Sequence, residues 1–461
     1  MNDALRILGS FIPPDLSPAY LRALAVPVAE TIGMAAAGML VAFAVGVPLA
    51  VIIGTRAPGH RLVGTVLASL RAIPDLTLAI LAVVLVGLGP GAGVAALALF
   101  YTAMIGRVYG SLFLAADAAP LEALRATGAS RIPLAAFGLI PLTLADMLSF
   151  GTFAFECAMR ASVIVGAVGG GGLGTELIGS LNALDYHRAL TVVIVLVALV
   201  AGVDAFGMLV RRDARLALLL VPLGVIALRL DWPQIFAFRH AVHTFAGMFP
   251  PELRAAQIVS LPLLIAQTVL IAVGGTLIGA VLAAPISLIA ARRLAPVPVV
   301  LVVRRVLDVA RAIPEVVFGL ILVVSAGIGP LSGAIALGLH SAGVLGKLYA
   351  ETFENVPDAP IASLAATGAR PLAIAAFGFI PLALGPNVVH TLFRLEWNVR
   401  AATVVGLIGA GGIGQALYEA QQLFFYKEML AYILVTWGLV ALSDWFGERL
   451  RVRMGWHFVA G

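Results

Sequence analysis

The stretch EALRATGASRIPLAAFGLIPL, Glu122 to Leu142, determines how this sequence is interpreted. It places charged residues, Thr, Gly and Pro inside a chain whose other segments are strongly apolar. A second copy, ASLAATGARPLAIAAFGFIPL, occupies Ala362 to Leu382. A polar interruption that occurs twice at a fixed separation indicates an internal duplication.

The composition is that of a membrane protein. The 461 residues are 61% hydrophobic and only 11% charged, and the mean hydropathy is +1.06. This predicts a polytopic membrane protein, with membrane lipid as its surroundings. The net charge of +5 does not indicate nucleic acid binding, because the basic residues form short clusters between apolar runs. The single Cys157 excludes an internal disulfide, and the seven His residues show no metal-ligand spacing, so no metal site is expected. The N-terminus lacks the pattern of a cleaved signal peptide.

The duplication covers most of the chain. Residues 71–211 align without a gap on residues 311–451, and upstream the Pro13-Pro14 pair matches Pro250-Pro251 at an offset that is three residues smaller. The length change must lie between about residues 56 and 71. We therefore expect a first half at 8–211, a linker with an extra transmembrane helix at 212–244, and a second half at 245–455.

Apolar runs of about 20 residues predict the membrane spans. Five are expected in each half, at 29–54, 62–88, 92–115, 134–158 and 188–211, then at 263–290, 302–328, 332–355, 374–398 and 428–451. The short run 216–230 is interpreted as an eleventh span, because an odd helix between two five-helix halves keeps them parallel. The fold class is an all-α polytopic membrane protein of about eleven helices. Clusters of Lys and Arg place both copies of the opening stretch on the cytoplasmic side.

Several motifs resemble one known family. Glu122-Ala123, Gly128 and Ile140-Pro141 resemble the EAA loop of binding-protein-dependent ABC importer permeases. The runs from Glu156 to Gly174 and from Glu396 to Gly414 are similar to the phosphonate-transport permeases, and the second copy is the closer match. The sequence departs from the family at two places: Leu124 stands at the third EAA position, and Ala362 replaces the leading Glu.

The resemblance implies a fold, a function and partners. It implies a type I ABC importer permease fold in the plasma (inner) membrane, here as a fused tandem duplication. The chain would be no enzyme and hold no cofactor, because a separate ATP-binding subunit dimer would bind and hydrolyse ATP. A periplasmic or extracellular solute-binding protein would deliver the solute, a phosphonate or related phosphorus oxyanion. Consistent with this, the chain contains no Walker A motif.

The opening stretch is the candidate for ATPase coupling. Pro120 and Glu122 suit the start of a short helix, and Gly128 suits its end. In the family this helix docks in a groove of the ATPase, although an interfacial helix that only caps the bundle stays possible. The resemblance assigns coupling to Glu122, Ala123, Thr127, Gly128, Ala362, Thr367 and Gly368.

The charges beside the Gly-rich runs are candidates for the solute path or gate. Glu156 and Arg160 are four residues apart, as are Glu396 and Arg400, which predicts ion pairs within each helix. Alternatively the two arginines face a shared path, where a guanidinium suits an oxyanion. The Gly runs favour either close helix packing or an irregular segment that bends as a gate. The gate candidates are Glu156, Arg160, Gly172, Gly174, Glu396, Arg400, Gly412 and Gly414.

Two other functions stay open. Permeases for methionine share the EAA loop and a similar Gly-rich run, so another small solute is possible. An ion-driven secondary transporter of parallel repeats would require acidic residues in mid-membrane, and the sequence places no convincing Asp or Glu there.

Overall fold

The structure is a computed structural model that describes residues 9–213, 216, 219–230 and 238–453. These residues form helices and connecting turns, with no strand among them. The chain divides into two compact units, one built around residues 10–252 and the other around 253–424, and each is described separately. The limits predicted for the halves at residues 8 and 455 lie outside the described residues.

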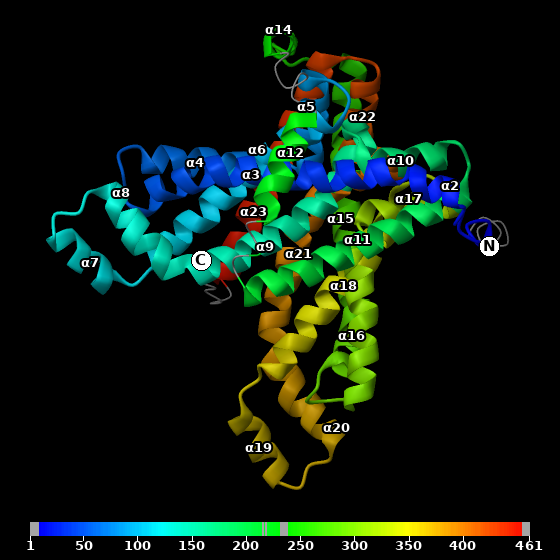
Figure 1. Cartoon of the computed structure of the whole chain (residues 1–461). Coiled ribbons are helices and arrows are strands. Elements are labelled where there is room, and N and C mark those ends of the chain that lie inside the picture. The colour runs from blue at the N-terminus through cyan, green and yellow to red at the C-terminus, as the bar shows by residue number, and fades with distance from the viewer. Residues whose placement is uncertain (1–8, 214–215, 217–218, 231–237, 454–461) are drawn as a thin grey trace. The chain divides into compact units, whose positions relative to one another are not determined.

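The first unit contains the helices that Figure 1 draws from blue to green. In chain order they are α2 (Pro18–Ala23), α3 (Ala25–Gly54), α4 (His60–Arg71), α5 (Asp75–Val86), α6 (Pro90–Ala115), α7 (Ala118–Ala126), α8 (Arg131–Leu134), the π-helical turn η1 (Ala135–Leu139), α9 (Ile140–Val165), the turn η2 (Gly166–Gly170), α10 (Gly172–Asn182), α11 (Tyr186–Arg212), α12 (Leu220–Leu230) and α14 (Phe238–Gly247).

The second unit repeats this order. Its elements are α15 (Ala255–Ala290), α16 (Val297–Ala312), α17 (Glu315–Ala326), α18 (Pro330–Glu354), α19 (Asp358–Ala366), α20 (Pro371–Ile374), η4 (Ala375–Phe379), α21 (Ile380–Val405), η5 (Gly406–Ala410), α22 (Gly412–Gln422) and α23 (Tyr426–Arg453). Each element from α3 to α11 has a counterpart from α15 to α23, down to the π-helical turns. The fold therefore confirms the internal duplication.

Eight helical segments of the described residues are long and apolar enough to cross a membrane, or ten if each of two bent pairs counts as one span. The all-α membrane fold is thus confirmed. The predicted spans 62–88 and 302–328 are not straight helices, since α4 meets α5 at 92° and α16 meets α17 at 82°. Pro74 and Pro314 lie at the bends, each directly before the second helix of its pair and with ψ near 146°, and proline also disfavours helical backbone in the residue before it.

The predicted eleventh span, 216–230, lies partly outside the described residues. Its described helix α12 has 11 residues and packs along α3. Eleven residues rise only about 16 Å, roughly half the hydrocarbon core of a bilayer. A full crossing by this segment stays a prediction.

The long helices pack closely because glycines face the neighbouring helix. A Cβ on Gly38 of α3 would lie 2.8 Å from Leu97 Cβ of α6, and one on Gly54 would lie 2.3 Å from Phe113 Cβ. The second unit uses the same device, since a Cβ on Gly279 of α15 would lie 2.4 Å from Ser341 Cβ of α18. Small residues at helix contacts are typical of membrane bundles, where close packing replaces the hydrophobic effect.

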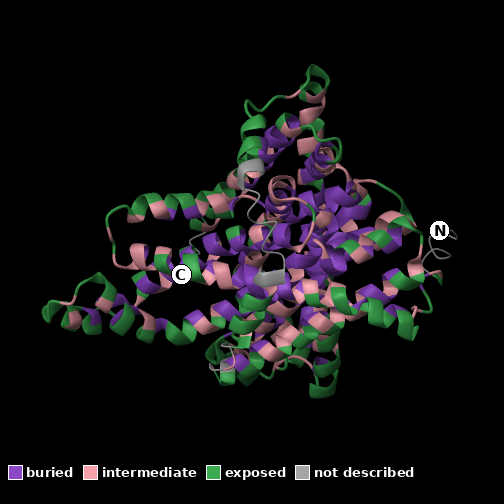
Figure 2. Ribbon diagram, turned by 45° about the horizontal axis from the view of Figure 1, so that its top comes forward, coloured by how far each residue is buried: buried purple, intermediate pink, exposed green. Residues whose placement is uncertain are grey.

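The outward sides of the long helices remain apolar. Figure 2 shows exposed and half-exposed residues along many of the helices. Many of the exposed side chains are large and hydrophobic, such as Leu270 and Val281 on α15, which are 65% and 70% exposed. In water such surfaces would be a liability, whereas lipid tails cover them at no cost.

Candidate functional site

The segments predicted to couple to an ATPase form short helices, α7 and α19, which keep the name coupling helices below. Each lies at the end of a pair of long helices, α7 beyond α6 and α9, and α19 beyond α18 and α21 (Figure 1). The start of α7 differs from the prediction, because the helix begins at Ala118 rather than near Pro120. Asp117 accepts a hydrogen bond from the Ala119 amide at 3.1 Å and is the cap that the sequence analysis missed.

The Thr-Gly pair ends both helices in the same way. The Thr127 hydroxyl donates to the Leu124 carbonyl at 2.7 Å, and the Thr367 hydroxyl donates to the Leu364 carbonyl at the same distance. Gly128 and Gly368 have φ of +81° and +77°, a left-handed conformation that favours glycine after a helix. The repeated Thr-Gly is therefore explained by backbone geometry.

Each coupling helix rests on a glycine of the following span. A Cβ on Gly138 would lie 2.8 Å from Leu121 Cδ2 and 3.1 Å from Leu124 Cδ1. A Cβ on Gly378 would lie 2.8 Å from Ile361 Cδ1 and 3.4 Å from Leu364 Cδ2. This contact explains why Phe-Gly recurs in both copies, and we call it the glycine seat.

The opposite side of each coupling segment is open. Glu122, Ala123 and Ala362 are exposed. Large apolar side chains accompany them at matching positions of the two units: Ile132 and Phe137 are 79% and 74% exposed, and Leu372 and Phe377 are 81% and 77% exposed. Exposed apolar side chains at the end of a helix pair are typical of a surface that another protein covers.

The charges of α21 pair with α23 rather than with each other. Glu396 pairs with Arg451, and Arg400 pairs with Asp444. The side chains are 13% to 26% exposed, so charges that lie in an apolar helix pair neutralise one another. The ion pair that the sequence predicts within α21 is therefore replaced by two pairs between helices.

The first unit carries the same residue types at matching positions. Glu156 is 8% exposed in α9, and Arg160 lies one turn further along. Asp204 and Arg211 of α11 occupy the positions that Asp444 and Arg451 have in α23. These four charged positions are thus the same in the two units.

The Gly-rich runs break the long helices. Gly169, Gly171 and Gly172 have φ between +71° and +107°, and Gly409, Gly411 and Gly412 repeat this pattern. A Cβ on Gly174 would lie 2.1 Å from the Val163 carbonyl oxygen, and one on Gly414 would lie 2.0 Å from that of Thr403. The irregular backbone is therefore present, with a close approach of the chain on either side of the break. Bending at this point as a gate stays a prediction.

Side chains from the first long helix of each unit cap the helix that follows the break. Glu30 accepts from the Gly172 amide at 2.7 Å, and Thr31 accepts from the Leu173 amide at 2.9 Å. Gln267 and Thr268 do the same for Gly412 and Ile413, both at 3.0 Å. These four residues were missed in the sequence, although an oxygen-bearing residue followed by Thr recurs in both copies.

The second unit contains a buried polar network built from four side chains. Arg394 Nε donates to the Ser341 hydroxyl at 2.9 Å, and Asn398 Nδ2 donates to Thr276 and Ser341 at 2.9 and 3.0 Å. All four residues are at most 7% exposed. The first unit has apolar or aromatic residues at these positions, Met39, Tyr101, Ala154 and Ala158. The network links α15, α18 and α21 and lay outside the motifs that the sequence analysis considered.

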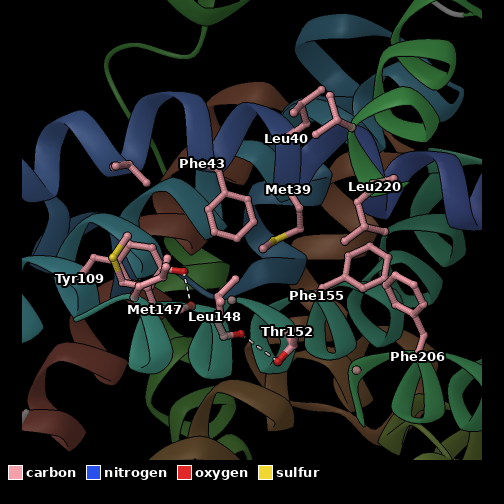
Figure 3. A pocket seen from close by; sticks show the side chains of 16 residues that line it. Met39, Leu40, Phe43, Tyr109, Met147, Leu148, Thr152, Phe155, Phe206 and Leu220 are labelled. Atoms are coloured by element: carbon pink, nitrogen blue, oxygen red, sulfur yellow. Dashed lines mark hydrogen bonds between the residues drawn. The ribbon is translucent and has the colours of Figure 1, made fainter. Parts of the chain in front are cut away.

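A cavity of about 330 Å³ opens between α3, α9, α11 and α12 of the first unit (Figure 3). Its wall is almost wholly apolar and includes Met39, Phe43, Phe155 and Phe206. The Tyr109 hydroxyl at its edge donates to the Met147 carbonyl at 2.6 Å, so it is already paired. The Thr152 hydroxyl in the wall donates to the Leu148 carbonyl at 3.0 Å. The lining offers no charged group to an anion, and the cavity fits an apolar occupant.

Comparison with known proteins identifies the family. The model of the binding-protein-dependent transport system inner membrane component matches residues 46–216 and again 283–456. The chain belongs to this family. It carries the family domain twice, which agrees with the two units of the fold, and it is a multi-pass protein of the inner membrane.

Two relatives and one solved structure are similar to it. The phosphate-import permease protein PhnE of Mycolicibacterium smegmatis is 31% identical, over 97% of this chain and 89% of the relative. The phosphite transport system permease protein PtxC of Stutzerimonas stutzeri is 37% identical, over 46% of this chain and 77% of the relative. The structure of the methionine ABC transporter MetNI in an inward-facing conformation covers 43% of this chain and 97% of its own, with 20% identity and a TM-score of 0.39.

Proposed function

We propose that this chain is the membrane permease of an ATP-driven importer for a phosphorus oxyanion such as phosphonate, phosphite or phosphate. The observation that carries the proposal is the similarity to the phosphate-import permease, which extends over nearly the whole of both chains. The phosphite permease supports the same solute class from a single half. Methionine and other small organic solutes are the alternative that the test must separate.

The chain would perform no bond chemistry and would hold no cofactor of its own. A dimer of ATP-binding subunits would dock on α7 and α19 at the cytoplasmic face, where Glu122, Ala123, Thr127, Gly128, Ala362, Thr367 and Gly368 shape the two helices. The exposed Phe137 and Phe377 beside them support docking by a partner with apolar pockets. A solute-binding protein would deliver the anion on the other side.

The gate would lie where the Gly-rich runs break the spans. The ion pairs of Glu396 and Arg400 hold α21 against α23 within the three turns that precede this break. Gly172, Gly174, Gly412 and Gly414 would then be the hinge, and Glu156 and Arg160 would do in the first unit what Glu396 and Arg400 do in the second. Because Arg400 is occupied by Asp444, we assign it to holding the helix rather than to the solute.

A membrane lipid would fill the apolar cavity of the first unit. An acyl chain matches its apolar wall, and α12 and α3 enclose it within the helices of the membrane-spanning bundle. This lipid is a structural partner in the proposal and takes no part in solute selection.

Uptake in proteoliposomes tests the proposed function. The chain is reconstituted with the ATP-binding subunit and the solute-binding protein encoded beside it, and uptake of phosphate, phosphite, methylphosphonate and methionine is measured with and without internal ATP. We expect ATP-dependent uptake of at least one phosphorus oxyanion and none of methionine. Methionine uptake alone would refute the solute class, and uptake that persists without ATP would refute the importer class.

A further inference from the structure

The second coupling helix is tied to its bundle by an arginine. Arg293 lies in the turn between α15 and α16, and its Nη1 donates to the carbonyl oxygens of Val356 at 2.5 Å and Glu354 at 3.3 Å. Its Nη2 pairs with Asp358 Oδ1, the first residue of α19, at 2.5 Å. One guanidinium therefore bridges the end of α18, the turn and the start of α19.

Further contacts surround this bridge. The Glu354 carboxylate accepts from the Arg292 amide at 2.8 Å and from Arg304 Nη2 at 2.7 Å. The Arg293 guanidinium also lies 4.9 Å from the centre of the buried Phe379 ring. We call Arg293, Arg304, Glu354 and Asp358 the arginine knot. A lone exposed ion pair stabilises little, whereas an arginine that satisfies the last carbonyls of a helix and stacks on an aromatic ring adds several contributions.

The first unit lacks the knot. Its positions that match Glu354, Asp358 and Arg304 hold Leu114, Ala118 and Gly64, and only Arg56 corresponds to Arg293. Leu114 and Ala118 offer no side-chain acceptor. In place of this bridge, α7 has the Asp117 cap at its start and the glycine seat of Leu121 and Leu124.

The exposed faces of the two helices also differ in charge. Glu122 and Arg125 are exposed on α7, and the same positions of α19 hold the exposed residues Ala362 and Ala365. The only charge within α19 is Asp358, an exposed carboxylate at the start of the helix that pairs with Arg293. The helix that is anchored presents small uncharged residues, and the helix without the anchor presents charges.

We propose that the two coupling helices are unequal docking surfaces. The arginine knot presets α19 as a rigid, uncharged surface for a shallow apolar groove, while α7 is a charged, compliant surface that takes its orientation from polar groups of the partner. The docking part rests on the proposed function. The difference in anchoring is a property of this chain alone and can be measured without a partner.

Hydrogen exchange of the purified chain in lipid nanodiscs tests the anchoring. We expect the amides of 359–366 to exchange about tenfold more slowly than those of 119–126, because contacts worth about 1.4 kcal/mol oppose local opening. Arg293→Ala should abolish most of this difference, and the matched Arg56→Ala should leave both segments unchanged. Asp358→Ala is a second variant in case Arg293→Ala misfolds. It keeps the contacts of Arg293 with the two carbonyl oxygens, so it should accelerate the exchange of 359–366 by a smaller factor than the loss of Arg293 would. Equal exchange of the two helices in the unaltered chain would overturn the anchoring.

Crosslinking to the ATP-binding subunit tests the docking surfaces. Single cysteines replace Ala123 or Ser363 after the native Cys157 is changed to Ala, and crosslink yield is compared at about 50 mM and about 500 mM salt, where charges are screened within a few ångströms. We expect the crosslink yield at position 123 to fall severalfold at high salt and the yield at position 363 to stay constant. The double change Glu122→Ala and Arg125→Ala should make the yield at position 123 independent of salt. The same salt response at both positions would overturn the unequal surfaces. No crosslink at either position would refute the proposed coupling role, while the exchange experiment would still decide the anchoring.

Discussion

Replacing the partners of one buried ion pair, singly and together, separates a structural role of Arg400 from a solute-binding role. Arg400 and Asp444 are 16% and 26% exposed and pair between α21 and α23. Arg400→Met removes the positive partner of the Asp444 carboxylate, and Asp444→Leu removes the negative partner of the Arg400 guanidinium. Breaking a buried pair from one side costs about 3–5 kcal/mol, whereas replacing both partners with apolar groups is often neutral.

Each single variant should therefore lower the Tm of the purified protein by about 3–5 °C, since the entropy of unfolding of a chain this long is roughly 1 kcal/mol per kelvin, and the double variant should regain most of that loss. Arg305→Met is the matched control, because Arg305 is 82% exposed and its pair with Asp308 spans 3.7 Å. It should change the free energy of unfolding by less than about 1 kcal/mol.

Uptake measured on the same variants gives the functional answer. If Arg400 only holds the helix, the double variant should recover stability and ATP-driven uptake together. A double variant that is as stable as the unaltered protein and yet transports nothing would refute this reasoning, because it would mean that the guanidinium itself contacts the solute.

Other changes test the remaining features. Gly138→Leu or Gly378→Leu should lower uptake at least tenfold with little change in Tm, because the added side chain displaces the coupling helix from the glycine seat. Gly128→Ala is the control: its Cβ meets open space at φ +81°, so it should cost only about 1 kcal/mol of backbone strain. Normal uptake in the leucine variants would contradict the glycine seat. Gly412→Val should abolish uptake, since a Cβ would lie 2.5 Å from Thr268 Oγ1 at φ +74°, and ATPase activity that stays coupled to transport would contradict a hinge there. Val47→Phe should reduce the lipid that copurifies, as measured by native mass spectrometry, and an unchanged lipid content would argue against an acyl chain in the cavity.

The sequence predicted the features that depend on local patterns. Thr127 and Gly128 indicate the end of a helix whatever surrounds them, and the repeat fixed the second copy at Thr367 and Gly368. The spans followed from apolar length, because lipid imposes a minimum on each. Pro74 and Pro314 were visible in the sequence, but their effect was underestimated, since the apolar run continues through the 92° and 82° bends.

Contacts between distant segments could not be predicted in this way. Glu396 has Arg400 within reach along its own helix, and only the packing of α23 shows that Arg451 is its partner. Glu30 and Thr31 lie 142 residues along the chain from the amides that donate hydrogen bonds to them. Arg293 is one of two adjacent arginines in a turn, and its role depends on where α18 ends.

The unbroken helical stretch between each coupling helix and each Gly-rich break has a mechanical consequence. α9 contains 26 residues, and at about 1.5 Å per residue it is a rod of roughly 39 Å. If it pivots at the Gly-rich end, a tilt of about 5° displaces the end beside the coupling helix by roughly 3 Å, about the size of a side-chain step. α21 has the same length but contains Pro386, which removes one backbone hydrogen bond and makes that rod easier to bend. The same displacement of the two coupling helices would therefore move the Gly-rich break at the end of α9 more than the one at the end of α21, because α21 takes up part of the displacement by bending.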